Sequence, residues 1–278
     1  MIEIALCLAI IGFALISILL VLPSGMNTQR DTREETIIGQ DASELMEAIR
    51  NGARGDDGLT NNVYAITNYY TEFDNSGRVV NQAYFSTHGC SGYNGYTYNS
   101  AVTVFGGSAT PLPAMPITNG LRIIGILSTP EYVNNNLPIS SLFNTPFTSN
   151  HVVAYVRSFS GLAAEKPPQN NQIMQEDAFS YRLLCVNAPL AVDTNQYNFN
   201  FSQYGYLHQL AGNMRELRLL FEWPEEPNGN VGGFRQTFRS TIAGQLIVTN
   251  YGAPPQNLFP GVYPLYFYQS QSFTTNVP

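Results

Sequence analysis

Side chains able to do chemistry are few in this chain and lie far apart along it. The three histidines, His88, His151 and His208, share no metal-ligand spacing. His88 precedes Cys90 by two residues, but a cysteine nucleophile needs a base in reach and a lowered pKa. A loop histidine beside a disulfide cysteine is therefore the favoured interpretation. The sequence also lacks a Gly-x-Ser-x-Gly motif, a phosphate loop and a dinucleotide fingerprint, so no enzyme is expected.

Two acidic stretches carry oxygen atoms of the kind that Ca²⁺ binds: Asp56-Asp57 and residues 222–230 (EWPEEPNGN). Neither stretch has a recognisable calcium-loop spacing. Solvated acidic loops are the favoured interpretation, so the sequence predicts no metal site and no cofactor, with Ca²⁺ as the alternative. Asn200-Phe-Ser202 matches a glycosylation sequon, which is a weak signal in isolation.

The three cysteines divide between two environments. Cys7 lies in a long apolar stretch, where a small buried hydrophobe is expected. Cys90 and Cys185 lie outside that stretch, and in an exported protein they would be oxidised together. We predict a disulfide between Cys90 and Cys185, and the alternative is two separate buried thiols.

The overall composition excludes one class of partner. The net charge is −7, charged residues make up 12% of the chain, and Lys166 is the single lysine. Such a chain has no basic patch for nucleic acid. The many Asn, Thr, Ser, Gly and Tyr residues indicate a neutral polar surface, which suits an extracellular or packed environment.

One carboxylate does stand in an unusual place. Glu3 opens an apolar run, residues 4–22, that is broken only by Gly12 and Ser17. The run is long enough to cross a bilayer as a helix, and a carboxylate there is costly. Three simpler interpretations are weaker. A cleaved secretory signal normally begins with basic residues, and an ordinary membrane anchor normally has flanking Lys or Arg residues. A buried core helix is rarely so long and so uniformly apolar.

The apolar run continues into an amphipathic stretch. Within residues 26–51, Ile38, Ala42, Leu45 and Ile49 fall at helical spacing, and Asn51-Gly52 supplies a stop. The two stretches together predict one continuous helix about 75 Å long, at roughly 1.5 Å per residue. We predict a helical part, residues 1–54, in which 1–23 meets lipid or other apolar helices and 24–54 lies on a globular head.

This N-terminal stretch resembles that of type IV pilins and of the related pseudopilins of type II secretion systems. Ile2-Glu3, Gly12 and Pro23 correspond to the family pattern of an early glutamate followed by an apolar helix with a glycine and a proline. Pro23 stands a few positions later than in the family. The resemblance covers residues 1–51, and it implies two further residues before Met1 and a basic leader that is cleaved.

The remainder, residues 55–278, reads as a β-rich head, which gives an α+β fold with the helix packed on a mainly antiparallel sheet. A boundary or long loop is expected near residues 164–171. Asp74-Asn-Ser-Gly77 predicts a hairpin turn. Strands are predicted at residues 62–73, 78–86, 101–105, 121–128, 152–158, 179–186, 216–223, 234–248 and 264–273, with Pro224 ending the seventh.

By this resemblance the chain is a structural subunit of an extracellular or cell-surface helical filament. Before assembly it is a single-pass inner-membrane protein, with prepilin peptidase and the inner-membrane assembly machinery as partners. Identical subunits then bundle their apolar helices, Glu3 meets the terminal amine of a neighbour, and Gly12 and Pro23 soften the helix. The alternatives are a minor or tip pseudopilin acting as an adhesin or cargo-binding module, and a membrane-anchored enzyme, for which no site residues are evident.

Overall fold

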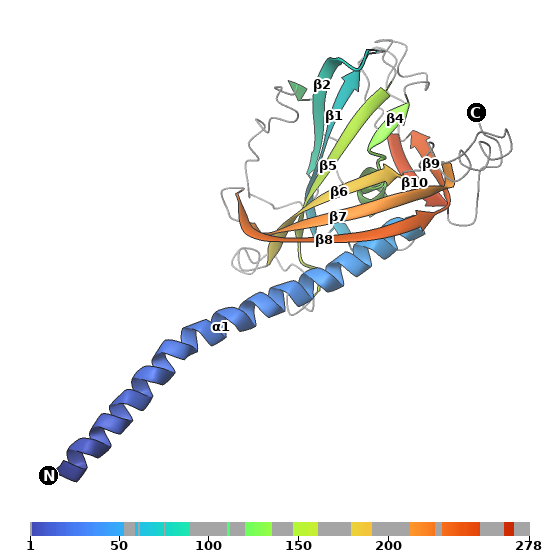
Figure 1. The fold of residues 1–278 in the computed structure, drawn as a ribbon. Helices are drawn as coiled ribbons and strands as arrows, with labels where there is room; N and C mark the ends of the chain where they lie inside the picture. The colour runs from blue at the N-terminus through green and yellow to red at the C-terminus, as the bar shows by residue number, and fades with distance from the viewer. Residues whose placement is uncertain are drawn as a thin grey trace, which may run out of the picture.

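A computed structural model describes residues 2–52, 59–60, 62–74, 76–88, 110–111, 120–134, 147–160, 179–190, 212–225, 230–250 and 264–269 (Figure 1). In these parts, a long N-terminal helix carries a mostly antiparallel β-sheet at its C-terminal end. The predicted α+β class is therefore confirmed. The proposed boundary at residues 164–171 lies outside the described residues, as does the predicted strand at residues 101–105.

Helix α1 (Ile2–Asn51) is one uninterrupted helix. It ends where the sequence predicts, because Gly52 adopts a left-handed φ of 67° and its N–H donates to the Ile49 carbonyl at 3.2 Å. A Cβ at position 52 would lie 2.8 Å from the Tyr268 carbonyl oxygen. Glycine is thus required at this point by both backbone conformation and close packing.

The main sheet has eight strands in the order β3-β2-β1-β5-β6-β7-β8, with β4 pairing β5 beside this path. All of its neighbours are antiparallel except the short parallel pair β2–β3. The strands are β1 (Val63–Phe73), β2 (Val79–His88), β3 (Thr110–Pro111), β4 (Tyr132–Asn134), β5 (Phe147–Arg157), β6 (Ser180–Pro189), β7 (Met214–Glu225) and β8 (Val231–Ala243). Strands β9 (Gln245–Asn250) and β10 (Pro264–Gln269) form a separate pair.

The predicted hairpin turn between β1 and β2 is confirmed. Asp74 Oδ1 accepts the backbone N–H groups of Ser76 and Arg78, both at 2.8 Å, and Gly77 has a φ of 73°. A side chain that holds the turn backbone and a glycine at the left-handed position together fix the reversal.

The predicted strand at residues 121–128 is wrong, because this stretch forms helix α2 (Gly120–Leu127). Its apolar residues, Ile123, Ile124, Ile126 and Leu127, are buried on several sides of the helix. A short apolar run that is buried all round has no period that separates strand from helix.

Two further strand predictions need correction. The single strand expected over residues 234–248 is divided into β8 and β9 at Gly244, which has a φ of 134°. Strand β7 also does not end at Pro224. It continues to Glu225 with a register shift against β8, and the proline lies at this irregularity, where it costs no regular ladder bond.

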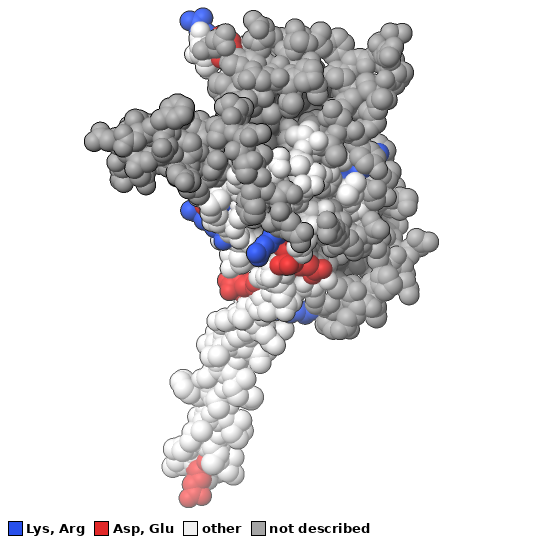
Figure 2. All heavy atoms as spheres, turned by 90° about the vertical axis from the view of Figure 1, so that its right-hand side faces the viewer, with Lys and Arg blue, Asp and Glu red and all other residues white. Residues whose placement is uncertain are grey.

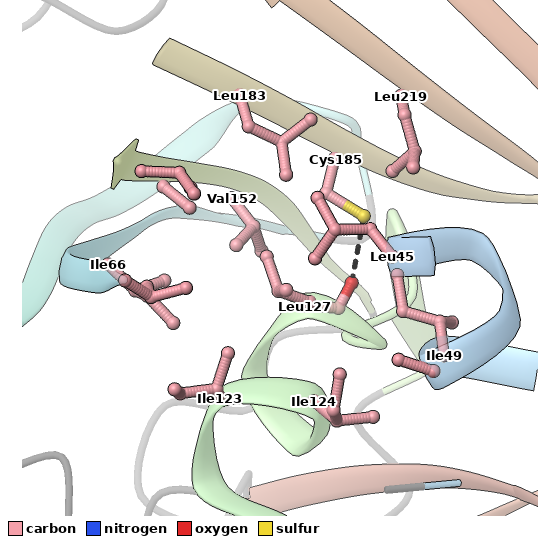
Figure 3. Packing of buried hydrophobic residues seen from close by; sticks show 14 of the residues in the cluster. Leu45, Ile49, Ile66, Ile123, Ile124, Leu127, Val152, Leu183, Cys185 and Leu219 are labelled. Atoms are coloured by element: carbon pink, nitrogen blue, oxygen red, sulfur yellow. Dashed lines mark hydrogen bonds between the residues drawn. The ribbon is translucent and has the colours of Figure 1, made fainter. Parts of the chain in front are cut away.

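The core lies between one face of the sheet and a layer formed by α1, α2 and β10. In Figure 3, Leu45 and Ile49 of α1, Ile124 and Leu127 of α2 and Cys185 of β6 point toward one another. Gly125 permits α2 to lie against β10, because a Cβ there would lie 2.8 Å from both Leu265 Cβ and Phe267 Cζ. The second half of α1 is therefore an integral part of the head.

Candidate membrane and assembly helix

The first half of α1 makes no contact that buries it. Every side chain from Ile2 to Leu22 is exposed except Gly12, which is intermediate. The large apolar side chains exposed here are Ile2, Ile4, Leu6, Leu8, Ile10, Ile11, Phe13, Leu15, Ile16, Ile18, Leu19, Leu20, Val21 and Leu22. By length and composition α1 is able to cross a membrane. An exposed apolar helix of this length is consistent with membrane association.

Glu3 lies in the first turn of α1 and is exposed. Figure 2 shows acidic atoms at the far end of an arm whose other atoms are uncharged. The N-terminus of a helix carries a partial positive charge, so a carboxylate is stabilised in the first turn. The Glu3 carboxylate is therefore favourably placed with respect to the dipole of its own helix.

Gly12 and Pro23 lie within the continuous helix. A Cβ at Gly12 would have nothing within 4 Å, so a lone chain gives no packing reason for this glycine. Pro23 has no N–H, which leaves the Leu19 carbonyl without its usual partner. Helix softening at these positions stays a prediction.

Between the apolar run and the head, α1 is polar and exposed. The hydroxyls of Thr28, Thr32 and Thr36 donate to carbonyls one turn earlier, at 3.0, 2.9 and 2.8 Å. Arg30 Nε donates to Glu34 at 2.8 Å, and Glu34 is the first buried residue of the helix. Contact with the head thus begins at position 34.

From there α1 packs through the predicted stripe. Ile38, Ala42, Leu45 and Ile49 are fully buried, which confirms the amphipathic interpretation. Asp41 lies on the same face and is also fully buried. The Tyr181 hydroxyl on β6 donates to Asp41 Oδ2 at 3.0 Å. The contact between helix and head therefore contains a buried polar link.

The electrostatics of this link are unusual. Burial raises the pKa of the Asp41 carboxyl, while the hydroxyls of Ser160, Tyr181 and Ser158 and the backbone of Phe159 act in the opposite direction. Burial also raises the pKa of Tyr181 well above its ordinary value, and the nearby Asp41 adds to the effect. Tyr181 accordingly stays protonated and serves as a hydrogen-bond donor.

Sequence reasoning missed Asp41, although its spacing was informative. Residues 38, 41, 42 and 45 follow the i, i+3, i+4, i+7 pattern of one helix face, so Asp41 belongs to the buried stripe. Tyr181 alternates with the buried Leu183 and Cys185 along β6, which places it on the same side of the sheet.

The cysteines are only partly described. Cys185 is buried, and its thiol donates to the Leu127 carbonyl at 3.0 Å (Figure 3). Burial raises the pKa of this thiol to about 12. Cys90 lies outside the described residues, so the Cys90–Cys185 disulfide stays a prediction. Cys7 is exposed on the apolar half of α1 rather than buried within the chain.

The histidines and acidic residues considered as catalytic or metal-binding candidates do not form a common site within the described residues. His88 is the last residue of strand β2, so its predicted place in a loop is wrong. His151 lies on β5 with its ring in an edge contact to Tyr69, and His208 is outside the described residues. Burial lowers the pKa of His151, and nearby Arg182 lowers it further. Glu222 is paired with arginines, and within the described ranges no three His, Cys, Asp or Glu side chains form a group that could hold a metal ion. Asp56-Asp57 lies outside those ranges.

Comparison with protein-family models, curated proteins and solved structures gives no significant match.

Proposed function

We propose that this chain is a structural subunit of an extracellular helical filament, of the type IV pilin or pseudopilin kind. The observation that carries the proposal is the division of α1 into two halves. Its second half is built into the head, whereas residues 2–22 are apolar on every side and exposed. An ordinary anchor needs the same apolar length, but it does not need Glu3 in its first turn.

Assembly then follows from the apolar segment. In the membrane, residues 2–22 are covered by lipid. In the filament, the same segments of neighbouring subunits cover one another. Apolar surface stays out of water in both states, so transfer from lipid to filament avoids the cost of hydrating it. Side chains exposed all round the helix allow contact with more than one neighbour, as a bundle requires.

Glu3 supplies register in this proposal. By the resemblance of the N-terminus, its carboxylate meets the terminal amine of an adjacent subunit. A charge buried alone is very costly, whereas a paired and hydrogen-bonded charge is tolerated. Subunits that slide out of register would lose this pairing, so one spacing between neighbours is favoured.

Electron microscopy of material sheared from cells that produce this protein tests the proposal. Filaments composed mainly of this chain, with residues 2–22 packed together in a central bundle, are the expected result. Filaments that carry the chain only at their ends would favour the minor or tip subunit instead. If no filaments form under any growth condition, the filament proposal fails and a membrane-anchored module takes its place.

A further inference from the structure

The only carboxylate of α1 that is completely buried is Asp41, within the described part of the chain. Its Oδ2 accepts the Tyr181 hydroxyl at 3.0 Å. Its Oδ1 is buried and has no hydrogen bond of normal geometry, although the hydroxyls of Ser158 and Ser160 lie nearby. A carboxylate with one good donor is poorly compensated for the water it has lost.

No cation compensates this carboxylate in the described residues. The ion pairs of that part of the chain join Arg30 to Glu34, Arg182 and Arg235 to Glu222, and Arg218 and Arg239 to Glu216. Arg182 follows Tyr181 on β6 and therefore faces the opposite side of the sheet.

Among the described residues, the groups that face Asp41 are neutral or acidic. Tyr181 faces it from β6, and Ser158, Ser160 and the Phe159 backbone face it from the segment after β5. On α1 itself, Glu44 is exposed and acts electrostatically on Tyr181, and Glu34 is already paired with Arg30. Protonation removes the unpaired charge and turns the acid into a hydrogen-bond donor for the hydroxyls around it.

We infer that Asp41 is a pH-sensitive contact that sets how tightly the head holds helix α1. When Asp41 is neutral, residues 34–49 pack on the sheet without a buried charge. When it ionises, the same packing must accommodate a buried carboxylate that has no cation beside it among the described residues. The contact is therefore stronger in acid and weaker as the pH rises.

The direction of this pH dependence follows from the difference in proton affinity of Asp41 between the folded and the unfolded chain. Because burial raises the pKa of folded Asp41 above its unfolded value of about 3.9, the folded chain binds this proton more tightly. The stabilisation that this proton contributes is fully present when the pH is below the pKa of Asp41 in the unfolded chain. It is lost as the pH rises through the pKa of Asp41 in the folded chain. Within that window, the folding equilibrium constant contributed by this group falls by up to about tenfold per pH unit.

The test compares the unfolding of full-length wild type and Asp41→Asn in detergent micelles from about pH 4 to about pH 9, a range that spans the expected titration. Asparagine keeps an acceptor for Tyr181 and cannot ionise. The stability of the variant relative to wild type is expected to rise with pH and then level off. Glu44→Gln, an exposed carboxylate on the same helix, should show no such rise. A difference between Asp41→Asn and wild type that does not change with pH overturns the inference.

Tyr181→Phe provides a second test that keeps Asp41. Loss of the hydroxyl that donates to Oδ2 removes a group that favours the ionised form, so the pH-dependent window should extend to higher pH. An unchanged window would contradict the inference. Hydrogen exchange at residues 34–49, compared between wild type and Asp41→Asn at each pH, shows whether the change lies in the contact between helix and head.

Discussion

Glu222 on β7 lies directly opposite Arg182 on β6, and its carboxylate accepts hydrogen bonds from Nε at 2.8 Å and from Nη2. Arg235 on β8 lies opposite Glu222 on the other side, with its Nε 3.3 Å from Oε1. The Glu222 side chain is only 10% exposed, compared with 36% for Arg182 and 69% for Arg235. One nearly buried carboxylate thus links three neighbouring strands.

Glu222→Gln is expected to destabilise the fold by about 2 kcal/mol, because Arg182 loses the counter-charge beside it. Denaturant unfolding measures the loss. Arg235→Gln is the matched control. Its side chain is largely exposed, so its pair with Glu222 should contribute less than about 1 kcal/mol. Equal losses in the two variants would show that the carboxylate is not the centre of this link.

Gly125→Ala should destabilise the head by about 1–3 kcal/mol, because the added methyl group would meet Leu265 and Phe267 at 2.8 Å. Gly39→Ala on α1 is the opposite case, since a Cβ at that position would have nothing within 4 Å and alanine favours a helix by about 1 kcal/mol. Thermal unfolding should therefore shift downward for the first variant and upward for the second. A stabilised Gly125→Ala would mean that α2 lies farther from β10.

Non-reducing peptide mapping is expected to join Cys90 to Cys185. Alkylated free thiols at both positions would refute the bridge. In reduced protein, Cys185 should resist alkylation near neutral pH until the chain unfolds, because burial raises its pKa to about 12 and shields the sulfur. Rapid alkylation of Cys185 in the folded, reduced protein would contradict the buried position.

Glu3→Ala should leave membrane insertion intact, because the apolar length of α1 is unchanged. It should reduce filament yield, because the proposed pairing of Glu3 with a neighbouring subunit is lost. Membrane fractionation and quantitative microscopy of sheared filaments measure the two effects separately. Glu44→Ala, which removes an exposed carboxylate near the head, serves as the control. A normal yield of filaments from Glu3→Ala would exclude the register role.

Strong periodicity made the helix and several strands predictable from sequence. The stripe of Ile38, Ala42, Leu45 and Ile49 indicated the buried face of α1, and Gly52 indicated its end. Alternation along residues 217–223 likewise predicted β7. These features are local, since each depends on the spacing of neighbouring residues along one element.

The remaining features depend on partners far away in the chain. Helix α2 could not be separated from a strand, because its all-round burial is created by α1, β10 and the sheet together. Asp41 could be placed on the buried face, but its hydrogen bond comes from Tyr181, 140 residues later. Pro224 was expected to end β7, whereas an irregular register against β8 accommodates it.

The polar stretch of α1 separates two surfaces that would otherwise affect each other. Residues 2–22 measure about 30 Å along the helix, which matches the hydrocarbon core of a bilayer, and contact with the head begins only at Glu34. Residues 23–33 therefore act as a stalk of about 16 Å. That length exceeds the Debye length of about 8 Å at physiological ionic strength. In the proposed membrane-bound state, the headgroup layer takes up part of this length. The head then lies about one Debye length from anionic lipid headgroups, and its charges are partly screened from them.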